Sequence, residues 1–362
     1  MHCDDYRPVP TRTGYERVLA HRVDPIYANT AKKPGTVTKI TKTSMLVTYD
    51  DGELVHYELG RKFGIWSGKT IPHQLATTLK VGEKVDAGTI LTYNSNFFDA
   101  DTLSPGQVVY KAGVLARTVL WESADTLEDS CALSADFNGK LSTTATHIRY
   151  IKVSFDQDVR NMVQVGESVD ADSILCTVLN PVGGNSDLFN DAALDILKAI
   201  ANLNPRAKHE GVIEKIEVLY SGDVEEMSDS LRQLVDKSDE ELYRYRRMMK
   251  LSPASGNVDA SYRCDGKPIG IDTVAIKVYI TGPVGMGAGD KVVFAHQMKS
   301  IVGRIITTPI TTEDGKPVDA IFGYQSIANR IARSPELLGT TNTLLLLATD
   351  DVVKTYFSDE AQ

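Results

Sequence analysis

One phrase occurs twice in the sequence and constrains the fold more than any other feature. Residues 81–91 read VGEKVDAGTIL, and residues 165–175 read VGESVDADSIL. Each copy has a Val-Gly-Glu turn, a short strand, an acidic turn and a second strand. Glycine and acidic residues at fixed offsets between apolar residues are typical of tight turns between strands. We therefore predict two β-corners of one design, with a purely structural role.

Such corners are common in barrel-sandwich folds, some of which carry a lipoyl group. A lipoyl-type carrier needs a lysine at an exposed hairpin tip. Residues 85–88, Val-Asp-Ala-Gly, supply none. A β-rich adaptor with lipoyl-like corners remains an alternative, but a carrier is disfavoured.

Most of the remaining sequence reads as short strands separated by turn signals. Residues 35–60 give two alternating runs on either side of Asp51-Gly52, which is a strong hairpin signal. Helical spacing of apolar residues is confined to residues 188–202, to residues 224–250 and to the segment from Arg333 onward.

The 224–250 helix has a possible apolar stripe, and the segment before it, 209–223, reads as a pair of strands. The stripe consists of Leu231, Leu234, Val235, Leu242 and Tyr243. The sequence therefore predicts a mainly β chain with helical insertions, an α+β class, and an acidic tail at its C-terminus.

Composition excludes some classes of function. The 39 basic residues are outnumbered by 48 acidic ones, giving a net charge of −9, whereas a free-standing nucleic-acid binder is usually basic. The four cysteines include no Cys-x-x-Cys pair, which disfavours a zinc ribbon or a disulfide framework. The longest apolar run, at 344–348, is too short to span a bilayer. We expect a soluble, intracellular protein with no membrane partner.

Residues 286–330 hold the most informative cluster of charges. Lys291 follows a Gly-Asp turn, Lys299 lies eight residues later, and Arg330 ends the segment. Neither a base nor a nucleophile accompanies them. Fixed lysines and an arginine suit phosphate binding, since lysine acts as a point charge and arginine as a planar fork. The alternative is that these are solvated surface charges on a barrel.

Four collinear segments resemble the β subunit of multisubunit RNA polymerases. GDK-x4-H-x2-K at 289–299, with EDGKPVDAIF and ANRI after it, is similar to the family's GDK…RHGNKG…PVDI…PSRM segment. WESADTLEDSCALS at 121–134 is similar to WNGYNFEDSIL. GYER, KKPGTV and the first VGE phrase precede it in the family's order, and residues 152–270 lie where the β flap is inserted.

The resemblance implies a role for each matching residue. Lys291 and Lys299 would contact the RNA 3′ end and phosphates beside the nucleotide-addition site. Arg330 would reach the triphosphate of the incoming nucleotide. Glu128 and Asp129 would lie close to the second of two magnesium ions. Together these groups would offset charge on the transferring phosphoryl group.

His296 matches a family histidine near the same site, but its surroundings differ from the family pattern. The glycine-rich AGRHGNKG becomes VFAHQMKS, and PSRM becomes ANRI. WNGYNFED becomes WESADTLED, which loses an aromatic residue and an asparagine. The loss of glycines around His296 puts close backbone approach there in doubt. All three sets of changes are those expected of a divergent polymerase. They leave open a catalytically decayed β-like scaffold or assembly protein.

The resemblance also predicts the domain organisation, a split double-psi β-barrel and hybrid-binding body interrupted by a flap-like insertion. The expected divisions are a β-rich body with the Glu-Asp motif, the insertion, a second barrel part and a helical, acidic tail. Their bounds are 1–151, 152–270, 271–335 and 336–362.

The family's catalytic magnesium is held by a D-x-D-x-D motif on another subunit. Asp99-Ala-Asp101 and Asp170-Ala-Asp172 offer two carboxylates each, and we read both pairs as turn residues. The N-terminal half of β and its C-terminal clamp segment have no counterpart here. We therefore expect partner chains: an N-terminal β fragment and β′-type fragments, one of which holds most of the Mg²⁺. The other ligands would be DNA template, RNA transcript and NTPs.

Such a fragmented, diverged chain looks like the split polymerase of a giant tailed bacteriophage. That origin would place it in the cytoplasm of the infected bacterium, whether or not it is also packaged in the virion. Cations near the end of the 224–250 helix would bind RNA or a promoter-specificity subunit, or else form a solvated helix face. They are Arg244, Arg246, Arg247 and Lys250.

Overall fold

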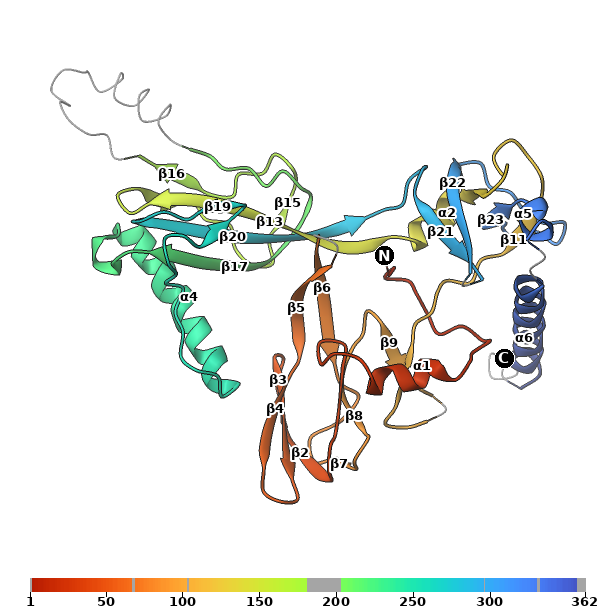
Figure 1. Cartoon of the computed structure of the whole chain (residues 1–362), viewed down its shortest axis with the longest axis horizontal. Coiled ribbons are helices and arrows are strands. Elements are labelled where there is room, and N and C mark those ends of the chain that lie inside the picture. Colours follow the sequence, from red (N-terminus) through yellow and green to blue (C-terminus); the bar gives the residue numbers. More distant parts are fainter. Residues whose placement is uncertain are drawn as a thin grey trace. The chain divides into compact units, whose positions relative to one another are not determined.

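The computed structural model describes residues 2–66, 69–102, 104–180, 203–295, 297–330 and 333–356. They form two compact units, each assembled from separate stretches of chain (Figure 1). Unit 1 comprises Met1–Arg61, His73–Thr143 and Val284–Gln362, and unit 2 comprises Lys62–Pro72 and Thr144–Pro283. The chain passes from one unit to the other within four strands: β5 (Gly60–Trp66), β6 (Lys69–Ala76), β13 (Thr143–Ser154) and β20 (Thr273–Val284).

The first part of unit 1 consists of hairpins. Its elements are α1 (Tyr15–Val18), η1 (Leu19–His21), β1 (Ala28–Thr30), β2 (Gly35–Ile40), β3 (Ser44–Tyr49), β4 (Leu54–Glu58), β7 (Lys84–Val85), β8 (Ile90–Asn94), β9 (Phe98–Ala100) and β10 (Val108–Tyr110). The order β4-β3-β2-β7 makes one sheet, and Gly52, at φ +87°, lies in the turn that joins β3 to β4. This confirms the hairpins expected over 35–60.

The second part of unit 1 carries the five-stranded sheet β11-β23-β12-β22-β21. Its elements are β11 (Thr118–Leu120), β12 (Ser130–Ser134), α2 (Ala135–Lys140), β21 (Lys291–Phe294), β22 (Met298–Ile306), β23 (Ala320–Phe322), α5 (Tyr324–Ala328) and α6 (Ser334–Tyr356). Strand β12 is central, parallel to β22 and antiparallel to β23. The motifs around 128 and 299 therefore meet in one sheet, although they are far apart in sequence.

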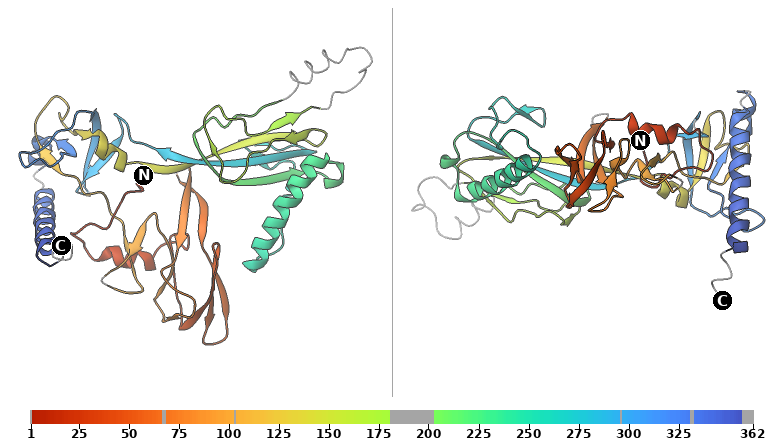
Figure 2. Two further views of the ribbon diagram at one scale, coloured as in Figure 1. Left: turned by 180° about the vertical axis from the view of Figure 1, so that it is seen from behind. Right: turned by 90° about the horizontal axis from the view of Figure 1, so that it is seen from below.

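Unit 2 is built on long strands covered by a helix. Its further elements are β14 (Asp158–Arg160), β15 (Ser168–Val169), β16 (Thr177–Leu179), β17 (Gly211–Ser221), η3 (Val224–Glu226), α4 (Asp229–Met248), β18 (Arg263–Cys264) and β19 (Lys267–Pro268). Ser228 caps α4 by accepting the N–H of Leu231, and Leu231 and Val235 are buried in the unit's core. Figures 1 and 2 show α4 against the β17 side of the sheet.

The two repeated phrases form the same structure. The N–H of Gly82 donates to Val37 O at 2.7 Å in unit 1. In unit 2, the N–H of Gly166 donates to Ile213 O, also at 2.7 Å. The partner segments match as well: 31–40 reads AKKPGTVTKI and 207–216 reads AKHEGVIEKI. The order of partner segment and repeated phrase along the chain differs between the units. The partner segment precedes the phrase in unit 1 and follows it in unit 2.

Several sequence expectations can now be compared with the structure. The fold class, mainly β with helical insertions, is confirmed. The helix expected over 224–250 is present, but its regular part is Asp229–Met248, because Met227 adopts an extended conformation between η3 and α4. The prediction of two strands over 209–223 was wrong. Most of this segment forms one strand, β17, with a register shift after Ile213.

The apolar stripe on α4 is only partly right, and one predicted helix lies outside the described residues. Leu231 and Val235 are buried, whereas Tyr243 is 50% exposed. The helix expected over 188–202 falls among residues that the structure does not describe. The double-psi barrel remains a prediction.

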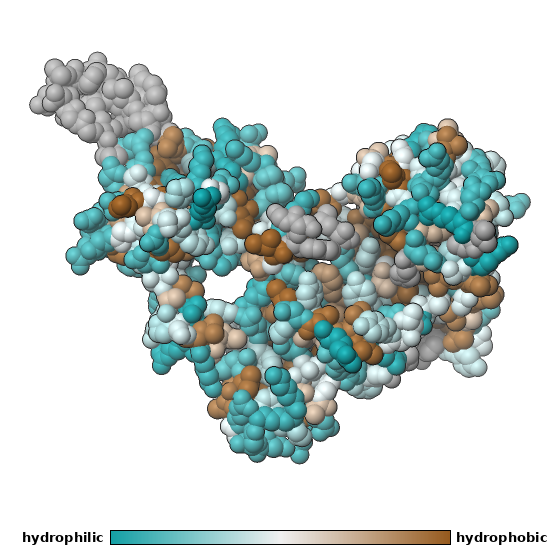
Figure 3. Space-filling view, in the orientation of Figure 1, coloured by the Kyte–Doolittle hydropathy of each residue, from teal (hydrophilic) through white to brown (hydrophobic). Residues whose placement is uncertain are grey.

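The C-terminal helix α6 is a single helix whose second half is exposed. Leu344 to Leu347 all reach the surface, and Figure 3 shows hydrophobic residues where α6 lies. Among the described residues, no helix is both long enough and apolar enough to cross a membrane.

Candidate functional site

The two lysines lie on one exposed face of the β21–β22 hairpin. In the antiparallel register, Lys291 pairs with Ile301 and Val293 pairs with Lys299. Residues directly opposite in such a pair share a face, so these four side chains lie together, and all four are exposed. Lys291 and Lys299 are diagonal neighbours, a relationship that places residues roughly 7–8 Å apart. Two positive charges therefore project from the same small area.

The Gly-Asp turn before Lys291 is fixed to the next strand. The N–H of Gly289 donates to Val302 O at 2.7 Å, and Asp290 O accepts the N–H of Val302 at 2.9 Å. The Asp290 carboxylate accepts the N–H of Gly287 at 2.9 Å. The aspartate of this motif thus shapes the turn, and Lys291 begins the strand from a constrained position.

Glu128 and Asp129 come immediately before β12, the neighbour of β22. Asp129 O accepts the N–H of Ile301 at 2.9 Å, and Ile301 is the residue opposite Lys291. Both acidic side chains are exposed. Glu128 has φ +53°, a sparsely populated conformation for a residue other than glycine. The Glu-Asp motif therefore leads directly into the strand that lies beside β22 of the lysine hairpin.

Arg330 reaches the same place from the segment after α5. Its Nη2 donates a 2.5 Å hydrogen bond to Asp129 Oδ1, and the two side chains are 40% and 50% exposed. The hydroxyl of Ser326 donates to Glu128 O. The sheet and α5 thus bring together five of the six predicted site residues: Lys291, Lys299, Arg330, Glu128 and Asp129.

The sixth predicted residue, His296, lies outside the described residues. The hairpin loop around it can still be characterised from its neighbours. Ala295 has φ +49°, and Phe294 packs on Phe322 with ring centroids 4.8 Å apart. Met298 is buried in the core of the sheet. Side chains that replace the family's glycines and polar groups are therefore used for packing.

Sequence reasoning missed two residues that join α5 to the loop before β12. They are Ser326 and Glu122, whose Oε1 accepts the N–H of Gln325 at 2.6 Å. Glu122 and Gln325 are separated by 203 positions. No local pattern indicates a contact of that separation, so only the folded sheet reveals it.

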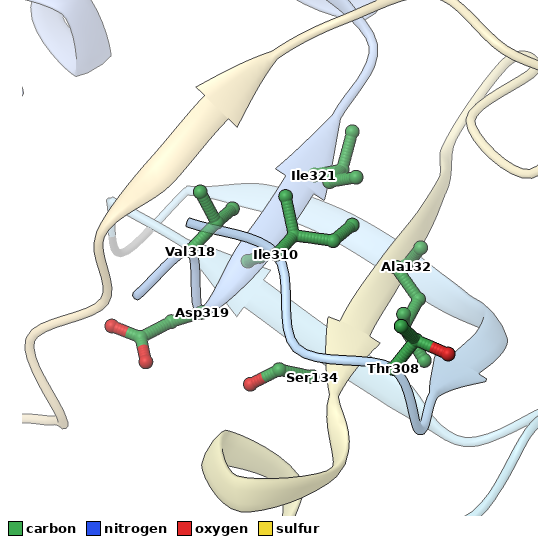
Figure 4. A pocket seen from close by; sticks show the side chains of 9 residues that line it. Ala132, Ser134, Thr308, Ile310, Val318, Asp319 and Ile321 are labelled. Atoms are coloured by element: carbon green, nitrogen blue, oxygen red, sulfur yellow. The ribbon is translucent and has the colours of Figure 1, made fainter. Parts of the chain in front are cut away.

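A small hollow in the same sheet is lined by residues that hold neighbouring strands together (Figure 4). Its lining includes Ile310, Val318 and Asp319. Asp319 Oδ2 accepts the N–H of Arg117 at 2.8 Å, and Asp319 O accepts the N–H of Ser134 at 2.8 Å. The aspartate of the Pro-Val-Asp segment therefore ties strands together.

The paired aspartates elsewhere have structural partners. Asp170 accepts the N–H groups of Asp172 and Ser173 in a turn, as predicted. For the other pair the turn prediction was wrong only for Asp99, which lies in β9. Asp101 begins a turn, in which its carbonyl accepts the N–H of Ser104 at 3.3 Å, and its buried side chain pairs with Arg17 at 2.7 Å. Within the described ranges, no group of three or more His, Cys, Asp or Glu side chains could hold a metal ion.

The site is chemically a set of fixed charges. Cys131 on β12 is buried, and burial raises the pKa of its thiol, so it stays protonated and unreactive. Exposed ammonium and guanidinium groups on constrained backbone can bind phosphate oxygens and stabilise negative charge. Two adjacent carboxylates can contact a cation or its water ligands.

Comparison with known proteins finds relatives of one kind, although at low identity. No family model matches the chain. It is 23% identical over 316 residues to the DNA-directed RNA polymerase subunit beta of Rubrobacter xylanophilus, covering 83% of this chain and 25% of the relative. The subunit beta of Syntrophomonas wolfei is 22% identical over 316 residues, covering 83% of this chain and 26% of the relative.

A third relative, the subunit beta of Mycoplasmoides gallisepticum, is 23% identical over 324 residues, covering 83% of this chain and 20% of the relative. The chain spans about a quarter of the length of these curated relatives or less. It is thus similar, over most of its own length, to one segment of the β subunits of DNA-directed RNA polymerases, a β-subunit-like fragment.

Proposed function

We propose that this chain is the C-terminal β part of a multisubunit DNA-directed RNA polymerase. The observation that carries the proposal is that the two lysines and the Glu128-Asp129 pair lie on or beside neighbouring strands of one sheet, with Arg330 hydrogen-bonded to Asp129. The similarity to β subunits over 83% of the chain also supports it. In this role the chain binds the RNA–DNA hybrid, the RNA 3′ end and the phosphates of the incoming NTP.

In this proposal each kind of side chain has a different role. Lys291 and Lys299 neutralise phosphate charge at the RNA 3′ end. Arg330, released from Asp129 or shared with it, forms a fork to the triphosphate. Glu128 and Asp129 carry the oxygen ligands that Mg²⁺ prefers, and so fit a contact near an ion held mainly by a β′-type partner. The metal supplies polarisation of the reacting phosphate and activation of the attacking hydroxyl.

The exposed end of α4 belongs to the flap-like part of this proposal. Arg244 pairs with Glu240, and Arg247 lies exposed near the helix end. We propose that this face contacts RNA or a promoter-specificity subunit. Reversing the charges of Arg244 and Arg247 tests this better than removing α4, because Leu231 and Val235 belong to the core. Unchanged promoter use and RNA-exit crosslinking in the reversed variant would exclude that contact.

Purification from infected cells tests the assembly. We propose that the chain acts in the cytoplasm of a bacterium infected by a giant tailed phage, as one subunit of a split enzyme. A tagged chain should bring down a subunit with a D-x-D-x-D motif and an N-terminal β fragment. The eluate should extend an RNA primer on a DNA template. A chain recovered alone, without extension activity, would contradict the proposal.

A catalytically decayed scaffold is the second candidate. It is favoured by the hairpin loop, where Phe294 packs on Phe322 and Met298 is buried in place of glycine-rich backbone. A scaffold predicts that Lys299→Ala leaves primer extension by the assembled complex unchanged. A working site predicts a large loss.

A further inference from the structure

The short helix α5 is held to the loop 121–129 at its beginning and middle. Arg330, two residues beyond the end of α5, is hydrogen-bonded to Asp129 of the same loop. Its N-cap residue, Gly323, has no side chain with which to cap it. Glu122 supplies the acceptor instead, by receiving the N–H of Gln325 at 2.6 Å. The Ser326 hydroxyl donates to Glu128 O in the middle of the helix.

Gly323 is the position that lets the backbone of the loop 121–129 pack against the start of α5. A Cβ there would lie 2.5 Å from Thr126 O and 3.3 Å from Glu122 Oε1. Real Cβ atoms do not approach backbone oxygen at 2.5 Å, so glycine is needed for the contact.

The loop that carries Glu122 is itself rigidly organised. Thr126 is fully buried, and its hydroxyl donates to Trp121 O at 2.8 Å and accepts the N–H of Ser123 at 2.9 Å. Asp125 pairs with Arg304 of β22 at 3.3 Å. Glu122 therefore projects from a fixed support, as a positioning residue must.

The last link runs from α5 to Arg330. The N–H of Asn329 donates to Gln325 O at 2.9 Å, and the N–H of Arg330 donates to Ile327 O at 3.2 Å. Gln325 is thus held by Glu122 through its N–H and holds the end of the helix through its carbonyl. Displacing the first turn displaces the backbone from which Arg330 reaches out.

We infer that Glu122 is a positioning residue, which caps α5 from the neighbouring loop and so fixes Arg330 for the incoming nucleotide. The inference rests on the proposed function, in which Arg330 binds the triphosphate. Glu122 does not itself touch substrate. Its loss raises the KM for NTPs and leaves kcat almost unchanged, because only the approach of Arg330 is altered.

The first measurement is amide hydrogen exchange of the full chain, which needs no activity. In Glu122→Ala, exchange across 323–330 should be about fivefold faster or more, the scale for loss of a helix cap. Glu122→Gln keeps an oxygen acceptor and should restore most of the protection. Asp136→Ala is the control, since it removes an exposed carboxylate from the first turn of α2, outside the loop 121–129. Unchanged exchange in Glu122→Ala would overturn the inference.

The second measurement is a double-mutant comparison in the assembled complex. Glu122→Ala should raise the KM for NTPs about three- to tenfold in the native background and have no further effect in Arg330→Ala. An equal rise in both backgrounds would mean that Glu122 acts through another group. If the native complex extends no RNA, the proposed function fails, while hydrogen exchange still decides whether Glu122 holds α5.

Discussion

Arg330 donates a 2.5 Å hydrogen bond to Asp129, although 201 positions separate the two residues in sequence. The contact connects the segment after α5 with the residue immediately before β12. It joins the two motifs whose partners in a polymerase would be an incoming triphosphate and a magnesium ion. A guanidinium held by one carboxylate is oriented before substrate arrives, which lowers the ordering cost of binding.

Arg330 should therefore govern NTP affinity more than the rate of addition. We expect Arg330→Ala to raise the KM for NTPs about tenfold to a hundredfold, the scale for a lost charge-assisted bond. Arg330→Lys keeps the charge and loses the fork, so it should recover only part of the affinity. Single-nucleotide addition at varied NTP concentration measures both. A normal KM in Arg330→Ala would remove Arg330 from the substrate site.

The paired lysines should act on the chemical step. Replacing Lys299 by Ala removes a positioned cation and should slow nucleotide addition by roughly two to three orders of magnitude. Lys291→Ala should act in the same direction, because Lys291 lies on the same face. Lys84→Ala, at an exposed position on β7, is the control and should leave the rate unchanged.

The measurement is pre-steady-state addition of one nucleotide by complexes whose subunit content has been verified. We expect all variants to assemble equally, because both lysines are exposed and neither belongs to the core. A Lys299→Ala complex that adds nucleotides at the native rate would support the decayed scaffold instead.

Local patterns in the sequence predicted the hairpins and the main helix well. Asp51-Gly52 between alternating runs is a complete local signal, and β3 and β4 form as expected. The α4 stripe was right only around Leu231 and Val235. Beyond them, Tyr243 has helical spacing but no core to contact, and periodicity alone does not show where a core ends.

Long-range relationships were beyond reach of local patterns. The cap that Glu122 gives to α5 depends on β11 and β23 being adjacent. Asp101 does begin a turn, as predicted, but its burial and its ion pair with Arg17 depend on the folded unit and have no local signal. The site residues themselves came from resemblance, since exposed lysines on strands carry no local signal of function.

The histidine near the start of the chain should make stability depend on pH. His2 packs on Phe97 with ring centroids 4.4 Å apart, and its Nε2 lies 3.0 Å from Lys111 O. Burial lowers the pKa of His2 to about 4, and the hydrogen bond to Lys111 O only partly offsets this. The unfolded chain has a histidine pKa near the ordinary 6.5.

Below about pH 6.5 the unfolded state therefore binds a proton that the folded state does not, and stability falls until about pH 4. The loss is at most about 1.4 kcal/mol per pH unit. His2→Gln removes this titration, so its stability relative to the native chain should improve as pH falls. Chemical unfolding at pH 7 and pH 4.5 tests this, with His21→Gln, an exposed histidine, as control. Parallel pH curves for the native chain and His2→Gln would contradict it.

The close approach of two glycines in unit 2 gives the last prediction. A Cβ at Gly211 would lie 2.4 Å from Thr281 O, and a Cβ at Gly282 would lie 2.4 Å from Glu210 O. Either Gly211→Ala or Gly282→Ala must push strands β17 and β20 apart. We expect each to lower the free energy of unfolding by about 1–3 kcal/mol.

Gly35 holds the position in unit 1 that Gly211 holds in unit 2, and its Cβ would lie 2.7 Å from Thr48 O. The repeated design therefore predicts that Gly35→Ala lowers the stability of unit 1 by a similar amount. Gly285 has open space around it, so Gly285→Ala is the matched control and should be nearly neutral. Hydrogen exchange resolved by segment shows which unit each variant loosens. If Gly35→Ala left unit 1 as protected as Gly285→Ala does, the two corners would share a sequence phrase without sharing its packing constraint.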